Sequence, residues 1–245
     1  MKKLYFFGIK FNNFQIKDFT KVISKKGLFV FPSGPGLSTL DQNKEYLFAL
    51  KNSDYVFFDS GYFVLLLNYF KNINVKKFSG YLFIRLFINY LKKNRNLKIL
   101  SVDPSFSSLQ KNYDFFIKIG LKKKNIINYV APKYNLTKIE DKNLLKIINK
   151  YKPNYVLINI GGGVQEILGY NLKKNSKVKT SIICTGAAIS FLTGEQAPIN
   201  NIVDKLYIGW LLRIIYKPNV FIIRYFKAFK LFILVLKSKI SQKKS

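Results

Sequence analysis

The sequence predicts an α/β fold, in which a Rossmann-like parallel sheet has helices on both faces and a C-terminal helical appendage follows. Short apolar runs rich in β-branched residues recur up to residue 184, and such runs are typical of strands buried on both faces. Segments of helical spacing alternate with them, which indicates parallel strands joined by right-handed crossovers. The texture changes after Gly194, so we expect an α/β domain at residues 1–194 and a basic amphipathic appendage at 195–245.

The positions of the expected elements follow from these apolar runs and from the turn-forming and capping residues between them. Strands are expected at residues 4–9, 28–31, 55–58, 97–102, 125–130, 155–160 and 181–184. Helices are expected at 14–23, 38–50, 62–70, 83–91, 105–119, 141–149 and 164–172. The PSGPG segment at 32–36 indicates a turn, and Ser38 or Thr39 stands near the N-cap of the helix after it. The N-terminus, MKKLYFFGIKF, has too short an apolar core for a signal peptide, so we interpret it as the first strand.

Charge and composition limit the function. The 245 residues include 42 Lys and Arg against 12 Asp and Glu, a net charge of +30. This charge suits nucleic acid, an anionic membrane surface or anionic substrates, although drift towards lysine would explain part of it. The chain has no histidine, which excludes Ser-His-Asp and Cys-His chemistry. The lone cysteine, Cys184, lies in an apolar run and is interpreted as a core residue, and a disulfide framework is excluded.

The C-terminal region suggests contact with a membrane. No charge-free apolar stretch reaches the roughly 18 residues that span a bilayer, so we expect no integral membrane protein. Residues 218–236 are apolar at helical spacing with Arg224, Lys227 and Lys230 interleaved. Such a helix can lie on an anionic membrane, or it can pack on the core with a solvated basic face. The lysine-rich tail after Ser238 is expected to be mobile.

The clearest candidate site follows the strand that begins at Tyr155. In the run YVLINIGGGVQE, the apolar residues are followed by Gly161, Gly162 and Gly163, and then by the polar pair Gln165 and Glu166. Glycines at the carboxyl end of a strand let the backbone approach a ligand and point N–H groups at it. The segment therefore indicates a site for a phosphorylated ligand, and a plain glycine-rich strand–helix turn is the alternative.

One carboxylate is placed for acid–base chemistry. Asp59 follows an apolar strand directly and precedes Ser60 and Gly61. In a chain without histidine, a carboxylate is the most plausible general base, and capping of the next helix is the alternative role. No acidic cluster for a metal is visible, so a leaving diphosphate would need cations, and Arg213 and Arg224 are candidates, with surface solvation as the alternative.

The C-terminal half resembles the WecG/TagA/CpsF glycosyltransferases, glycosyltransferase family 26. The family's Gly-x-Pro-x-Gln-Glu turn reads GGGVQE here, with Gly163 at the usual proline. Its later motifs are similar to the segment TGAAISFLTG at 185–194, Ala197-Pro198, the WLLR segment at 210–213, Pro218 and Arg224-Tyr225.

The N-terminal half is similar to the family more loosely. The Asp-Gly motif, which carries the family's proposed base, looks like Asp59-Ser60-Gly61. A family arginine falls at Lys77, and a family threonine falls near Ser33. The departures include Gly209, Val220 and a VDP turn at 102–104 in place of Leu-Gly-Gly.

The resemblance implies an inverting, metal-independent enzyme that uses no cofactor and sits at the inner face of the bacterial plasma membrane, with the option of a homo-oligomer. Its substrates would be a UDP-sugar, typically of N-acetylmannosamine or its uronic acid, and a polyprenyl-diphosphate-linked N-acetylglucosamine. Asp59 would be the base. Gly161–Glu166, Lys77 and Ser33 would bind the donor, and Arg213 and Arg224 its diphosphate.

Two other classes remain open on the residues alone. A basic nucleic-acid-binding protein suits the charge and the many aromatic residues, but those residues lie in apolar runs and no nucleic-acid module is visible. A nucleotide-binding oxidoreductase lacks a G-x-G-x-x-G after the first strand.

Overall fold

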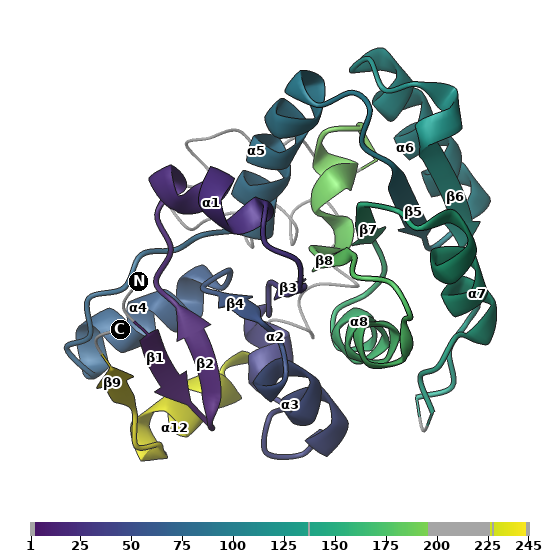
Figure 1. Cartoon of the computed structure of the whole chain (residues 1–245). Helices are drawn as coiled ribbons and strands as arrows, with labels where there is room; N and C mark the ends of the chain where they lie inside the picture. The colour runs from purple at the N-terminus through teal and green to yellow at the C-terminus, as the bar shows by residue number, and fades with distance from the viewer. Residues whose placement is uncertain (1–2, 137, 196–225, 227, 244–245) are drawn as a thin grey trace.

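The protein is described from a computed structural model, in which residues 3–136, 138–195, 226 and 228–243 are placed. Their strands form one sheet in the order β6-β5-β7-β8-β3-β4-β2-β1-β9 (Figure 1). The strands are β1 (Lys3–Phe6), β2 (Ile9–Asn12), β3 (Leu28–Val30), β4 (Tyr55–Phe57), β5 (Ile99–Asp103), β6 (Ile126–Val130), β7 (Tyr155–Ile158), β8 (Ser181–Cys184) and β9 (Ser241–Lys243).

The α-helices mostly fill the crossovers between these strands. They are α1 (Phe19–Ile23), α2 (Gly34–Leu37), α3 (Lys44–Lys51), α4 (Gly61–Phe70), α5 (Gly80–Lys93), α6 (Phe106–Lys118), α7 (Lys142–Tyr151), α8 (Val164–Asn175) and α12 (Lys230–Lys237). Short 3-10 helices are η1 (Ile16–Asp18), η2 (Lys123–Asn125) and η3 (Gly186–Phe191).

The sheet is parallel from β6 across to β2, and β1 pairs antiparallel with both β2 and β9. The predicted Rossmann-like sheet is therefore confirmed, with an antiparallel edge added. β5 has β6 on one side and β7 on the other, so the strand order reverses between β5 and β7. Ligands of open α/β sheets bind outside the carboxyl ends of the strands, at such a reversal.

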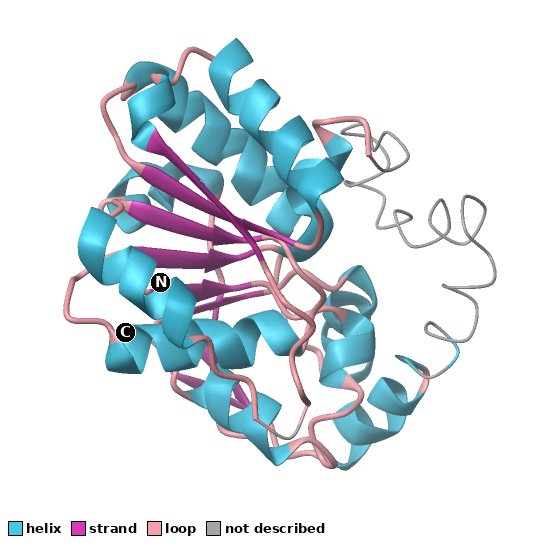
Figure 2. Cartoon of the chain, turned by 90° about the vertical axis from the view of Figure 1, so that its right-hand side faces the viewer, coloured by secondary structure: helices cyan, strands magenta, loops and turns pink. Residues whose placement is uncertain are grey.

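Helices cover both faces because the strand side chains alternate between two cores (Figure 2). Leu28 and Val30 of β3 pack in the core that includes α3, α4, α7, α8 and α12. Phe29 and Phe31 point the other way, into the core formed with α1, α5, α6 and η3. Burial on both faces explains why the strand segments are continuous apolar runs instead of alternating patterns.

The expected first strand is instead a hairpin. β1 and β2 are joined by Phe7 and Gly8, which both have positive φ, of 52° and 75°. Positive φ at both turn residues matches the twist of a two-residue hairpin, and glycine adopts it without a steric penalty. The continuous apolar character of residues 4–9 conceals this turn from a reading of the sequence alone.

The segment after β3 also differs from expectation. Residues 34–37 form the short helix α2, which Ser33 caps by accepting the Gly36 N–H at 3.3 Å. Pro35 fits in its first turn because no N–H is needed there. The next helix, α3, begins at Lys44, and its N-cap is Asn43, not Ser38 or Thr39. Asn43 is the N-cap because its side chain accepts the Tyr46 N–H at 2.9 Å. The hydroxyls of Ser38 and Thr39 instead donate to carbonyls of the preceding turn.

The described part of the predicted appendage packs back on the α/β domain. α12 contacts α4 and α2, and residues 241–243, expected to be mobile, form β9 at the edge of the sheet beside β1. The boundary at 195 stays a prediction. No helix within the described ranges is long and apolar enough to cross a bilayer.

Candidate active site

The sequence candidates gather at the carboxyl edge of the sheet. Ser33 follows β3, Asp59 follows β4, Gly161, Gly162 and Gly163 follow β7, and Gly186 follows β8. The helices α4 and α8 begin at this same edge because each follows a strand that ends there, and α5, which follows α4 through a loop, begins there because its first residue bonds Asp59. Helix N-termini carry partial positive charge, so the edge is suited to an anionic ligand.

Asp59 is held by the start of α5. Its Oδ1 accepts the backbone N–H of Gly80 at 2.8 Å. The cap of α4 is Ser60, whose hydroxyl accepts the Phe63 N–H at 3.2 Å. Asp59 therefore does not cap the helix that follows it. Its carboxylate lies against the N-terminus of a different helix, which stabilises its negative charge.

Gln165 and Glu166 tie the glycine turn to the end of β8. Glu166 Oε2 accepts the Gly163 N–H at 2.6 Å, and its Oε1 accepts from Gln165 Nε2 at 3.0 Å. Gln165 Oε1 in turn accepts the Gly186 N–H at 2.8 Å. Both side chains are buried and bonded to protein, so they shape the turn from beneath.

The glycine turn faces open space. A side chain built at Gly161 or Gly163 would meet no atom within 4 Å. Gly163 has a φ of 90°, which proline cannot adopt, so this turn differs from one with proline at that position. A backbone that is exposed at the carboxyl edge and free of side chains is available to a ligand.

Burial raises the pKa of Glu166 to about 7, although the hydrogen bonds from the Gly163 N–H and Gln165 lower it. The Glu166 carboxyl is 1 % exposed. The charge of Asp59 raises its pKa further, so the two carboxyls lie near enough to interact. Asp59 and the Gly163 turn therefore lie at the same edge of the sheet, with Asp59 near enough to influence Glu166.

Two close backbone contacts complete this arrangement. A Cβ on Gly80 would lie 3.4 Å from Thr185 Cβ, which places the start of α5 against the residue before Gly186. A Cβ on Gly34 would lie 2.9 Å from Ser60 Oγ, so α2 approaches the start of α4. Ser33 is thereby brought beside the Asp59 segment.

Lys77 lies in the segment that runs along the end of β4. The next residue, Phe78, donates its N–H to the Phe58 carbonyl at 2.9 Å, and Gly80 bonds Asp59. Lys77 therefore belongs to a segment whose next residues contact Phe58 and Asp59, and its role in the site stays a prediction. Arg213 and Arg224 lie outside the described residues.

A second polar cluster at this edge was not predicted. Asp103 at the end of β5 is 0 % exposed, and its Oδ1 accepts from Asn112 Nδ2 at 2.6 Å and Asn159 Nδ2 at 2.7 Å. Burial raises the pKa of the Asp103 carboxyl, and the charge of Glu195 raises it too. Glu195 itself accepts from Ser108 Oγ at 2.6 Å. The signal was the same as for Asp59, a carboxylate directly after a buried strand.

This cluster borders the reversal between β5 and β7. Asn159 links Asp103 to the strand that leads into Gly161. No group of three or more His, Cys, Asp or Glu side chains that could hold a metal ion occurs within the described ranges. The cluster instead fixes the base of the glycine turn.

The chain is thus a Rossmann-like α/β protein in which a carboxylate, Asp59, and a glycine turn follow strands that end at the same edge of the sheet. The chain belongs to the Glycosyl transferase WecG/TagA/CpsF family, whose sequence model matches residues 4–245. It is therefore a glycosyltransferase of cell-surface polysaccharide synthesis. No curated protein matches the chain in a sequence search.

Proposed function

We propose that the protein transfers an N-acetylhexosamine-type sugar from a UDP-sugar to a polyprenyl-diphosphate-linked acceptor. The sugar would be N-acetylmannosamine, its uronic acid or a related one. The acceptor hydroxyl attacks the anomeric carbon and forms the new C–O bond. The bond from that carbon to the β-phosphate oxygen breaks, UDP leaves with the electron pair, and the configuration inverts. The hydroxyl proton passes to Asp59.

The hydrogen bond from the Gly80 N–H to Asp59 is the observation that carries this proposal. It fixes the carboxylate at the edge where the Gly163 turn is open, and it favours the charged form that a base needs. A general base must reach the proton it removes, so in this proposal the acceptor hydroxyl lies between Asp59 and a donor held at the turn.

Charge on the departing UDP is balanced by the protein in this scheme, without a metal or cofactor. The N-termini of α4, α5 and α8 point at the edge, and exposed glycine N–H groups of the turn can bond phosphate oxygens. We assign Gly161, Gly162 and Gly163, supported by Gln165 and Glu166, to the donor, together with Ser33 and Lys77. Arg213 and Arg224 would complete the diphosphate site.

The lipid-linked acceptor requires a membrane-facing surface, and α4 and α12 form a candidate. Tyr69 is 79 % exposed and Phe229 63 % exposed, and Phe70 contacts Phe232 with ring centroids 5.1 Å apart. Lys71 Nζ donates to the Leu236 carbonyl at 2.9 Å, which fastens the two helices together. This α4–α12 face also exposes Leu65, Phe70, Phe226, Ile233 and Leu236.

The α4–α12 face is linked to the site through α4. The helix begins two residues after Asp59 and ends at Phe70, and its ten residues span about 15 Å. A bilayer that contacts the aromatic end of α4 would therefore hold a lipid diphosphate within reach of the base. We propose that the protein acts at the inner face of the plasma membrane.

The test is a transfer assay with a panel of UDP-sugars and a lipid-diphosphate-linked N-acetylglucosamine, with products identified by mass. We expect one donor to give a product heavier by one sugar residue, together with UDP. Addition of a chelator should leave the rate unchanged. Sugar transfer from other nucleotide sugars only, or to water only, would refute the proposed substrates.

A further inference from the structure

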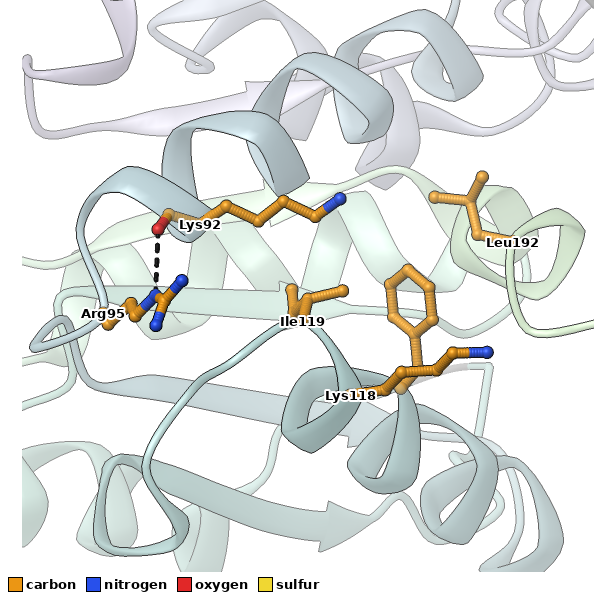
Figure 3. A pocket seen from close by; sticks show the side chains of 6 residues that line it. Lys92, Arg95, Lys118, Ile119 and Leu192 are labelled. Atoms are coloured by element: carbon orange, nitrogen blue, oxygen red, sulfur yellow. Dashed lines mark hydrogen bonds between the residues drawn. The ribbon is translucent and has the colours of Figure 1, made fainter.

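A cavity lies on the α5–α6 side of the sheet, away from the candidate active site. It has a volume of about 470 Å³ and is lined by Lys92, Arg95, Phe115, Lys118, Ile119 and Leu192 (Figure 3). Cavities that bind small molecules commonly have roughly this volume, in the range of about 300 to 1,000 Å³. The lining residues come from the C-terminal ends of α5 and α6 and from the residue after η3.

The cavity gathers three cations at the C-terminal ends of two helices, where the partial negative charge of the helix ends balances only part of their charge. Three of its six lining residues are cations and none is acidic. Within the described ranges, Lys92, Arg95 and Lys118 form no salt bridge. Like charges that share a cavity repel one another, and an anion bound between them would relieve that repulsion.

Arg95 is positioned for this role. Its Nε donates to the Lys92 carbonyl at 3.2 Å, and no other group among the described residues accepts from the guanidinium, so its remaining N–H groups can bond a ligand. Gly120 has a φ of 95°, and a Cβ there would come within 3.2 Å of the Arg95 Cζ atom. A glycine at this position therefore serves the backbone turn and leaves room for the guanidinium. Guanidinium is well suited to bidentate contact with phosphate oxygens.

The other half of the cavity is apolar. Phe115 and Ile119 lie one turn apart on α6, and Leu192 faces them from beyond η3. Lys92 extends along the cavity towards Leu192, so charged and apolar walls meet (Figure 3). From these two walls, we propose that the cavity binds a phosphate ester that carries an apolar group, and that the bound ligand acts as an effector of the active site.

Two elements connect this effector site with the catalytic edge. α5 donates the Gly80 N–H to Asp59 at its first residue and supplies Lys92 near its last. η3 donates the Gly186 N–H to Gln165 at its first residue and ends beside Leu192. The two elements also touch, because the Tyr81 and Phe191 rings lie 5.9 Å apart. A ligand that shifts the far ends of α5 and η3 would change the positions of Asp59 and Gln165.

The effector site is distinct from the donor site. The 14 residues of α5 span about 21 Å, which separates Lys92 from the Gly80 end of the helix. Binding at the cavity does not depend on the proposed transfer reaction. The two proposals can therefore fail independently.

The test uses the full chain, with phenyl phosphate as the probe and inorganic phosphate as its comparison. We expect phenyl phosphate to bind at least about tenfold more tightly than inorganic phosphate, because only the former fills the apolar wall. The triple variant Lys92→Gln, Arg95→Gln, Lys118→Gln should lose at least about tenfold in affinity. The control triple Lys142→Gln, Lys146→Gln, Lys150→Gln removes the same charge from α7 and should bind as the native chain does.

Two further measurements define the role and the source of the ligand. Saturating phenyl phosphate should change the dissociation constant of UDP by about fivefold or more, and the triple variant should abolish this change. The site would be overturned if the cavity triple bound phenyl phosphate as tightly as the native chain does. It would also be overturned if UDP displaced phenyl phosphate one for one. Probe binding with no effect on UDP would overturn the effector role.

Vesicles of phosphatidylcholine with phosphatidylglycerol distinguish the two possible sources of the ligand, a lipid headgroup and a soluble phosphate ester. Weaker vesicle binding by the cavity triple than by the control triple identifies a lipid headgroup, and equal binding identifies a soluble phosphate ester.

Discussion

The Gly80 N–H donates to Asp59 Oδ1 at 2.8 Å, so the first residue of α5 fixes the carboxylate that follows β4. Gly80 lies 21 positions after Asp59 along the chain, and all of α4 lies between them. This relationship gives Asp59 a fixed direction and a stabilised charge. It also makes the proposed base sensitive to one backbone donor.

Asp59→Asn should remove the base and preserve the fold. The amide oxygen can still accept the Gly80 N–H, so the start of α5 keeps its partner. We expect turnover to fall by about 10²- to 10⁴-fold, with UDP binding changed little. Steady-state assays and UDP titration measure the two effects. The control is Asp114→Asn on the exposed surface of α6, which should behave as the native enzyme, and near-native turnover of Asp59→Asn would remove the assignment.

Gly80→Pro removes the donor and keeps aspartate at position 59, but the proline ring takes the place of the N–H, so the carboxylate must turn away from the start of α5. Proline is tolerated at the first position of a helix, and Ser79 already has the extended conformation, with ψ of 155°, that precedes proline. The change deletes a hydrogen bond that favours the charged carboxylate, so the acidic limb of the kcat/KM profile should move to higher pH. Gly80→Ala keeps the N–H and makes only ordinary contact with Thr185, so its profile should match the native one. Identical acidic limbs in all three proteins would show that Gly80 does not tune the base.

The fold was predictable where burial alone determines it. β8 has the bounds expected for residues 181–184, because a strand buried on both faces is an unbroken apolar run. The Phe7–Gly8 turn was missed because it interrupts such a run without a polar signal. β9 was missed because its pairing with β1 depends on the distant N-terminus, and its own residues are polar.

The candidate site was predictable in its members but not in its connections. Asp59 and the glycine turn stand out as polar or glycine residues directly after apolar strands. The bond to Gly80 depends on where α5 begins in space, which no local pattern records. Gln165 and Glu166 were expected to bind the donor, and this role remains a proposal. The structure shows both side chains buried beneath the turn. Asp103 also follows a buried strand directly, as Asp59 does, but in the sequence it stands out only as part of the VDP segment that replaces the family's Leu-Gly-Gly turn.

Glu166 should make stability depend on pH in a definite direction. Its pKa is about 7 in the folded protein against an ordinary 4.5, so the folded state retains a proton that the unfolded state has lost between these values. The free energy of unfolding should therefore fall as the pH rises from about 4.5 to 7, by roughly 3 kcal/mol from this group.

Glu166→Gln isolates this effect because it cannot titrate. Urea denaturation of both proteins at pH 5 and at pH 8 measures how the free energy of unfolding of each depends on pH. We expect the variant to gain roughly 3 kcal/mol relative to the native protein between these conditions, even if lost hydrogen bonds make it less stable at the lower pH. Parallel stability curves would mean that Glu166 titrates alike in the folded and unfolded states.

Asp103→Asn should be tolerated, whereas Asp103→Leu should not. The Asp103 Oδ2 atom and the Oδ1 atoms of Asn112 and Asn159 are buried acceptors without a partner among the described residues. The amide introduced by Asp103→Asn supplies a donor to this group of acceptors and keeps one oxygen for the existing bonds. Asp103→Leu strands the two asparagine amides, at a cost of about 2–4 kcal/mol.

Denaturation at pH 8 distinguishes these two outcomes, because burial raises the pKa of the Asp103 carboxyl and its charged form is the less favourable one. Asp103→Asn should then be at least as stable as the native protein. Ser105→Ala, at the cap of α6 beside the cluster, provides a control that removes only a capping bond and should cost about 1 kcal/mol. Equal losses for the asparagine and leucine variants would show that a charged Asp103 is required.

The α4–α12 face should determine membrane binding more than the overall charge does. Tyr69→Ser together with Phe229→Ser removes two exposed rings from the face and leaves the net charge of +30 unchanged. Each ring contributes roughly 1.5 kcal/mol or more when buried in an interface, so vesicle affinity should fall by about 100-fold. The control pair Ile16→Ser and Leu136→Ser removes exposed apolar side chains elsewhere and should bind vesicles normally. Turnover should fall with a long-chain lipid acceptor and stay constant with a water-soluble short-chain one, because only the former must be drawn from the bilayer. Native vesicle binding by the Tyr69 and Phe229 variant would assign membrane contact to another surface.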